Sequence, residues 1–212
     1  MTDTRPARPD ERLRARLRVA LLLLLFAAPV LGAYGLYFWA PQDWQPVDRT
    51  NSGHLINPAR PVESLSLHDI DGSRLDQSLF IDKWTLLLVG PARCDEACTQ
   101  ALHDTRQVRT ALGRHAPRVR RVYVATDRAG IEQLQALLAD AHPDLRLLVA
   151  EGAEVYAIDR QFAVDGRSPL GNPYDVYLLD PHANWLMCYT PDIPPSGLLK
   201  DLKKLLRLSN IG

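Results

Sequence analysis

Two cysteines four residues apart, Cys94 and Cys98, are the residues of this chain with the clearest capacity for chemistry. They follow the apolar run Thr85 to Val89, which predicts a buried strand, and they stand where a helix should begin. One helical turn separates them, so their side chains share a face and their Cα atoms should lie about 6 Å apart. That distance suits a disulfide, and two thiolates can also hold a soft metal ion such as Cu(I).

The position of the pair favours function over packing, although both interpretations remain open. Cys98 adjoins the apolar stripe of the expected helix, and free cysteines are commonly buried in cores. In open α/β sheets, however, functional sites gather at the carboxyl ends of strands. The positive end of the helix dipole and Arg93 favour a thiolate there, whereas Asp95 and Glu96 oppose it.

The N-terminal part of the chain predicts a membrane anchor. Six arginines fall within residues 1–18, and the 22 residues 19–40 carry no charge. We therefore expect a basic cytoplasmic tail over 1–18 and one transmembrane helix over 19–40, with the rest of the chain outside the cytoplasm. In a bacterium this is a single-pass protein of the inner membrane with a periplasmic domain, where disulfides persist. A cleaved signal peptide ending near residue 33 is the alternative, but its apolar region is usually shorter.

The remainder of the chain predicts an extended tether over 41–62, rich in proline and polar residues, and a folded domain over 63–212. The net charge of zero for the whole chain gives no indication of nucleic-acid binding. The expected elements of the domain are a hairpin around 64–72, a strand at 85–89, a helix at 95–112, a strand at 118–125, a helix at 131–141, a strand at 145–150, a helix at 153–162, a hairpin of 176–179 and 185–189, and a helix at 197–208. This alternation predicts an α/β fold with a thioredoxin-like mixed sheet and flanking helices.

Three segments carry a resemblance to the Sco/SenC/PrrC group of membrane-anchored, thioredoxin-fold proteins. They are residues 65–73, the strand 86–90 followed by Cys94-x-x-x-Cys98, and residues 177–181 (YLLDP). The resemblance implies copper bound by the two cysteines and one distant histidine. It also implies a role in cytochrome c oxidase assembly, with a respiratory oxidase subunit or another assembly factor as the partner.

This chain departs from that group at the ligand position. Where the group has its histidine, this chain has Asn172, and an amide is a poor ligand for Cu(I). The candidate copper ligands are therefore Cys94 and Cys98 alone. Pro173 follows at the position where thioredoxin-fold oxidoreductases carry a cis-proline, which makes it a candidate cis-proline facing the cysteines.

Three functions remain open on the sequence alone. The first is a Sco-like thiol or copper protein for oxidase assembly, in which Cys94 and Cys98 form the redox pair. The second is a non-catalytic thioredoxin-fold binding module with a structural disulfide, and the third is a general periplasmic thiol–disulfide oxidoreductase. Cys188 is interpreted as a buried core cysteine, with pairing to another protein as the alternative. The basic face of the last helix is interpreted as solvated, with contact to lipid headgroups as the alternative.

Overall fold

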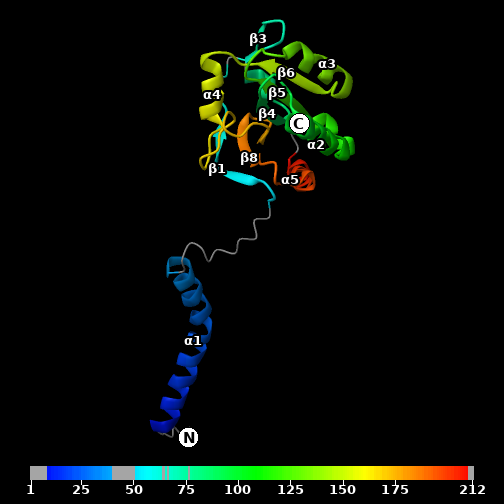
Figure 1. Ribbon diagram of the computed structural model, residues 1–212. Helices are drawn as coiled ribbons and strands as arrows, with labels where there is room; N and C mark the ends of the chain where they lie inside the picture. The colour runs from blue at the N-terminus through cyan, green and yellow to red at the C-terminus, as the bar shows by residue number, and fades with distance from the viewer. Residues whose placement is uncertain (1–8, 40–50, 64, 66, 76, 210–212) are drawn as a thin grey trace. The chain divides into compact units, whose positions relative to one another are not determined.

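The N-terminal helix is separate from the folded domain. A computed structural model describes residues 9–39, 51–63, 65, 67–75 and 77–209. The chain divides into two units, Met1–Arg49 and Thr50–Gly212. In the first unit, α1 (Pro9–Trp39) contains the stretch Arg16–Gly35, which is unburied and is long and apolar enough to cross a membrane (Figure 1). This helix fits the predicted membrane anchor, while residues 1–8 of the predicted tail and 40–50 lie outside the described residues.

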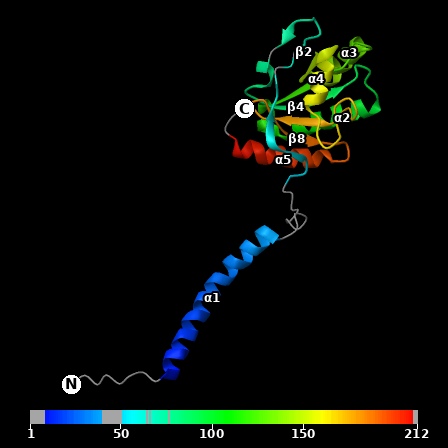
Figure 2. The ribbon, with the colours of Figure 1, turned by 90° about the vertical axis from the view of Figure 1, so that its left-hand side faces the viewer.

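The second unit is built on one mixed sheet of eight strands (Figures 1 and 2). Their order is β1-β8-β7-β4-β5-β6-β2-β3, in which β4, β5 and β6 are parallel and all other neighbours are antiparallel. The strands are β1 (His54–Pro61), β2 (Leu67–His68), β3 (Arg74–Leu75), β4 (Trp84–Gly90), β5 (Val119–Ala125), β6 (Leu145–Val149), β7 (Val176–Leu179) and β8 (Asn184–Tyr189). The predicted mixed sheet and both predicted hairpins are confirmed.

Helices cover both faces of this sheet and thereby bury its central strand on both sides. Every residue of β4 is buried. Leu86 and Leu88 join one core cluster with α2, α3 and α5, whereas Leu87 and Val89 join a second cluster with α4. This arrangement is typical of the continuous apolar strands at the centre of parallel sheets. The helices are α2 (Glu96–Ala111), α3 (Ile131–Ala141), α4 (Ala153–Gln161) and α5 (Pro195–Leu208), with short 3-10 turns at Gln77–Phe80 and Gly113–Arg118.

The prediction of an extended tether through residue 62 is wrong for its last part. Residues His54–Pro61 form β1, which pairs with β8 at the edge of the sheet. The pairing is irregular between Leu55 and Arg60. Pro58 and Pro61 have no N–H to donate, but an edge strand needs hydrogen bonds on one side only. Proline content therefore did not exclude a strand here.

One buried carboxylate holds the start of the domain against α5. The backbone N–H groups of Ser52 and Gly53 donate to Oδ2 of Asp201, at 2.8 and 3.0 Å. The hydroxyl of Tyr189 donates to the same oxygen at 3.1 Å. A Cβ on Gly53 would lie 2.6 Å from the Tyr189 ring, so only glycine fits there. The chain therefore enters the domain at a fixed point on α5.

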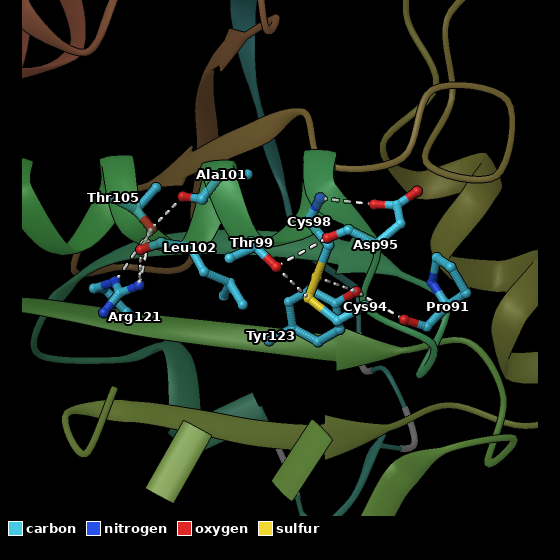
Figure 3. Close-up of a disulfide and its surroundings, with 10 residues drawn as sticks. All are labelled: Pro91, Cys94, Asp95, Cys98, Thr99, Ala101, Leu102, Thr105, Arg121 and Tyr123. Atoms are coloured by element: carbon cyan, nitrogen blue, oxygen red, sulfur yellow. Dashed lines mark hydrogen bonds between the residues drawn. A yellow bond between two sulfur atoms is a disulfide. The ribbon is translucent and has the colours of Figure 1, made fainter. Parts of the chain in front are cut away.

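A fully buried arginine joins α2 to the sheet. Arg121 of β5 donates through Nη2 to the carbonyl oxygen of Leu102 at 2.6 Å and to Oγ1 of Thr105 at 3.0 Å (Figure 3). Its Nη1 forms an ion pair with Asp144 at 3.2 Å. Burial lowers the pKa of Arg121, and the Asp144 carboxylate opposes that shift. Nε and Nη2 of this guanidinium thus fix the helix that carries the cysteines, while Nη1 pairs with Asp144, just before β6.

Replacement of Arg121 should lower the free energy of unfolding far more than replacement of its neighbour Arg120. We expect Arg121→Met to lower the free energy of unfolding by about 3 kcal/mol, because Asp144 and the Leu102 carbonyl lose their donor. Arg120→Met is the matched control and should cost less than about 1 kcal/mol, since Nη1 of Arg120 is buried without a hydrogen-bond partner among the described residues. Urea unfolding of the full chain in detergent, followed by circular dichroism, measures both. Equal costs for the two variants would contradict this role of Arg121.

Candidate functional site

Cys94 and Cys98 form a disulfide at the junction of β4 and α2 (Figure 3). Their Cα atoms lie 5.2 Å apart, which confirms that the two sulfur atoms are neighbours. Cys98 is fully buried, at 0% exposure, whereas Cys94 is only partly buried. A thiolate from another molecule can therefore reach the sulfur of Cys94 and not that of Cys98.

The start of α2 is fixed by Asp95, the residue immediately before the helix. Its Oδ1 accepts a hydrogen bond from the backbone N–H of Cys98 at 2.8 Å, the geometry of an N-cap. Oγ1 of Thr99 donates to the Asp95 carbonyl at 2.9 Å and lies 3.8 Å from Sγ of Cys94. The disulfide consequently lies at the positive end of the helix dipole, which favours a thiolate when the pair is reduced. The Asp95 carboxylate partly offsets that effect.

Two tyrosines and a glycine pack together beside the start of α2. The hydroxyl of Tyr123, in β5, donates to the Pro91 carbonyl at 2.9 Å and lies 3.8 Å from Sγ of Cys98. Burial raises the pKa of Tyr123, which keeps its hydroxyl neutral. A Cβ on Gly90 would lie 2.6 Å from both the Tyr123 hydroxyl and the ring of Tyr174. The last residue of β4 must therefore be glycine for these rings to pack there.

Sequence analysis did not identify Gly90, Tyr123 or Tyr174 as site residues. The glycine that ends the apolar run was the one available signal, because glycine in a strand often marks a close approach of other groups. The tyrosines come from distant parts of the chain. They meet at the glycine because β4 pairs with β5 and because the Tyr174 N–H donates to the Val89 carbonyl at 3.2 Å.

The prediction of a cis-proline at residue 173 is wrong. Among the described residues the only cis peptide bond is Asn57–Pro58, so the bond Asn172–Pro173 is trans. The chain instead turns into β7 at Tyr174, whose φ of 73° is unusual for a residue other than glycine. Burial, together with the carboxylate of Asp95, raises the pKa of Tyr174 to about 12. Pro173 still lies close to the start of α2, because it lines the same cavity as Asp95.

Two surface cavities adjoin the first turn of α2. One, of about 420 Å³, is lined by the partly buried Cys94 and by Arg93, together with residues of α3. The other, of about 450 Å³, is mostly apolar and lies between α2, the start of β7 and the connection from β8 to α5. Its apolar lining includes Ala97, Ala101, Pro173, Val176, Ile193 and Leu198. The disulfide is thus bordered by surface that another polypeptide can contact.

The donor set does not complete a copper site of the type that the sequence resemblance implies. Among the residues that the structure describes, no group of three or more His, Cys, Asp or Glu side chains could hold a metal ion. Asn172 is held by its backbone N–H, which donates to the Ser168 carbonyl at 2.8 Å. Cys94 and Cys98 are the predicted ligands that come together, and two sulfur atoms with an amide are a poor set for Cu(I).

The third cysteine is buried, as predicted, and its thiol is free. Cys188 lies in β8 with 3% exposure, and its Sγ is 4.0 Å from Oδ2 of Asp175. Asp175 is itself paired with Arg167, whose Nη2 donates to Oδ1 at 2.9 Å. Burial, and then the Asp175 carboxylate, raises the pKa of the Cys188 thiol to about 12. This thiol is therefore protonated and shielded at neutral pH.

Comparison with protein families gives one match over most of the domain. The model of the family described as transmembrane-like, thioredoxin-like, C-terminal domain matches residues 84–209. No curated protein matches the chain.

Solved structures of Sco proteins have the same fold. Copper-bound ScoI of Arabidopsis thaliana is 21% identical, with a TM-score of 0.58, over 69% of this chain and 98% of that one. Apo Sco1 of Thermus thermophilus is 20% identical, with a TM-score of 0.59, over 75% of this chain and 99% of that one. BsSco, a Sco-family cytochrome c oxidase assembly protein with a disulfide switch, is 15% identical, with a TM-score of 0.54, over 72% and 96%. The predicted likeness to Sco proteins is thus confirmed in the fold.

The three cysteines should differ sharply in their reactivity. At pH 8 a thiol with a pKa of about 12 is ionised in only about one molecule in 10,000, so Cys188 should not react with iodoacetamide in the native protein. Because its pKa is raised, the thiolate should stay scarce throughout pH 7–9. After reduction, Cys94 should be labelled before Cys98.

Peptide mass spectrometry of the full chain in detergent measures the labelling at each site. Labelling in guanidinium chloride is the control, in which Cys188 should react as fast as an ordinary thiol. Rapid labelling of Cys188 in the native protein, or of Cys98 before Cys94, would contradict the burial described above.

Proposed function

We propose that this chain, which belongs to the family of transmembrane-like, thioredoxin-like C-terminal domains, is a membrane-anchored thiol–disulfide protein that supports cytochrome c oxidase assembly. The observation that carries the proposal is the Cys94–Cys98 disulfide at the start of α2, with one accessible and one buried sulfur. The Sco-like fold supports the biological setting, since BsSco is an oxidase assembly protein with a disulfide switch.

The proposed reaction is a two-step thiol–disulfide exchange. In the reduced form, the Cys94 thiolate attacks a disulfide of the partner, forms a mixed disulfide and releases one partner thiolate. Cys98 then loses its proton and attacks Sγ of Cys94, which forms the Cys94–Cys98 bond and releases the second partner thiolate. Two electrons and two protons pass from the cysteine pair to the partner. The same steps in reverse oxidise a partner dithiol.

The surroundings of each sulfur suit these two roles. Cys94 borders a cavity and lies at the positive end of α2, so it is the sulfur that meets the partner. Cys98 is buried beside Tyr123. Its attack on Sγ of Cys94 is intramolecular, because the two sulfur atoms are neighbours on one helical turn. The proposed partner is a cysteine-bearing subunit of a respiratory oxidase or another assembly factor.

Copper delivery has weaker support than thiol exchange. Copper is present in the structure of the Arabidopsis Sco protein, which has this fold. In this chain the described donors do not complete such a site. If Cu(I) is carried as cargo, the reduced Cys94 and Cys98 are the residues that would hold it.

We place the domain outside the cytoplasm of a bacterium. The six arginines within residues 1–18, which precede the uncharged stretch 19–40, should stay on the cytoplasmic side, and residues 41–212 would then lie on the periplasmic side of the inner membrane. Thiols in that compartment undergo cycles of oxidation and reduction, which the proposed chemistry needs.

Substitution of the two active cysteines tests the function. Cys94→Ser and Cys98→Ser should each lower cytochrome c oxidase activity in membranes of the source bacterium at least fivefold, because neither single cysteine can complete the exchange. Cys188→Ala is the matched control and should leave oxidase activity unchanged, since its buried thiol takes no part. Protein levels are compared by immunoblot so that loss of folding is not mistaken for loss of chemistry.

Two outcomes would count against the proposal. Wild-type oxidase activity in both serine variants would rule out a thiol role in assembly and leave a binding module with a structural disulfide. Loss of disulfides from many unrelated periplasmic proteins, with normal oxidase, would indicate a general oxidoreductase instead.

A further inference from the structure

Helix α5 presents a row of positive charge on its exposed side. Lys200, Lys203, Lys204 and Arg207 follow the spacing i, i+3, i+4, i+7, and all four are exposed. The opposite side of the helix is buried in the core. None of the four belongs to an ion pair recorded among the described residues. We call these four residues the cationic stripe.

The stripe does not follow from the overall charge of the domain. Residues 50–212 contain 18 basic and 20 acidic residues, a net charge of −2. Such a domain has no general attraction to a negatively charged surface, so attraction must come from a local concentration of positive charge. The stripe supplies this local concentration of positive charge. The only acidic residue within α5, Asp201, does not offset it at the surface, because Asp201 is buried and accepts hydrogen bonds from Ser52 and Gly53.

The stripe lies on the helix at which the chain enters the domain. Ser52 and Gly53 donate to Asp201, the residue next to Lys200. Twelve residues separate Trp39, the end of α1, from Ser52. A chain of that length can span at most about 45 Å. Any membrane that α1 crosses is therefore always within that reach of α5, which gives its headgroups a high effective concentration.

We propose that the cationic stripe binds the anionic phospholipid headgroups of the membrane that anchors the chain. Lysine and arginine on one helix face, beside a membrane within reach, are the features that recognise such headgroups. Leu208, 76% exposed at the end of the stripe, adds apolar surface for the boundary between headgroups and acyl chains. This inference does not depend on the thiol chemistry. Docking through α5 would restrict the directions from which a membrane-bound partner can approach Cys94.

The lysines of the chain provide a direct test. There are four, of which three belong to the stripe, and the fourth is exposed Lys83. The full chain is reconstituted into vesicles of phosphatidylcholine alone, or of phosphatidylcholine with 30% phosphatidylglycerol. Amines are acetylated with a neutral reagent, and peptide mass spectrometry gives the rate at each lysine. Lys83 is the internal standard for reagent concentration.

We expect Lys200, Lys203 and Lys204 to react several-fold more slowly in the anionic vesicles, with Lys83 unchanged. Salt at 0.5 M should abolish the difference, because it screens exposed charges. Arg207→Gln should reduce the docked fraction relative to the undocked one about fivefold, the factor for one cation at an anionic surface. Arg160→Gln, which removes an exposed cation from α4, is the matched control and should have no effect.

The proposal is overturned if the stripe lysines react at equal rates, relative to Lys83, in the two kinds of vesicle. That result would indicate that the stripe is a solvated face or that it binds an acidic protein. Protection that is the same with and without anionic lipid, or that survives high salt, would also overturn the electrostatic basis. Because neither readout involves Cys94 or Cys98, the result is independent of the proposed redox function.

Discussion

The structure depends on how the first turn of α2 packs against the sheet. Cys98 is buried beside Tyr123 of β5, and Tyr123 in turn bonds to the Pro91 carbonyl in the loop before the helix. This contact fits only because Gly90 leaves room at the end of β4. One turn farther along α2, the carbonyl oxygen of Leu102 accepts a hydrogen bond from Arg121 of β5. The helix and the disulfide are therefore fixed to the sheet at two levels.

From that packing follows the difference between the two sulfur atoms. The helix turn that buries Cys98 leaves Cys94 at the surface, beside a cavity and at the positive end of the helix. A disulfide with one protected and one accessible sulfur can open by attack at a single atom and close again by an intramolecular step. Asn172 stands where the resemblance places a histidine, and for this reason we propose thiol exchange rather than copper binding as the activity of the pair.

Sequence analysis reached most of the fold because the elements follow simple patterns. The buried strand β4 is continuously apolar, and α2 and α5 have regular apolar faces, so their positions followed from periodicity. The cysteine pair was found because spacing alone places its members on one helix face. β1 was missed because its prolines resemble a linker, although an edge strand tolerates them. The cluster of Gly90, Tyr123 and Tyr174 was missed because these residues are far apart in the sequence and meet only in the folded sheet. The prediction for Pro173 was wrong because the topology of the fold does not determine whether the preceding peptide bond is cis or trans.

The most direct test of the central claim is the reduction potential of the Cys94–Cys98 disulfide in the full chain. The protein, with Cys188→Ala to remove the third thiol, is equilibrated with glutathione buffers, and its free thiols are trapped and counted by mass spectrometry. If the pair works in thiol exchange, its potential should fall between about −270 and −120 mV, the range of proteins with that activity. A potential below about −300 mV is typical of structural disulfides and would contradict this account.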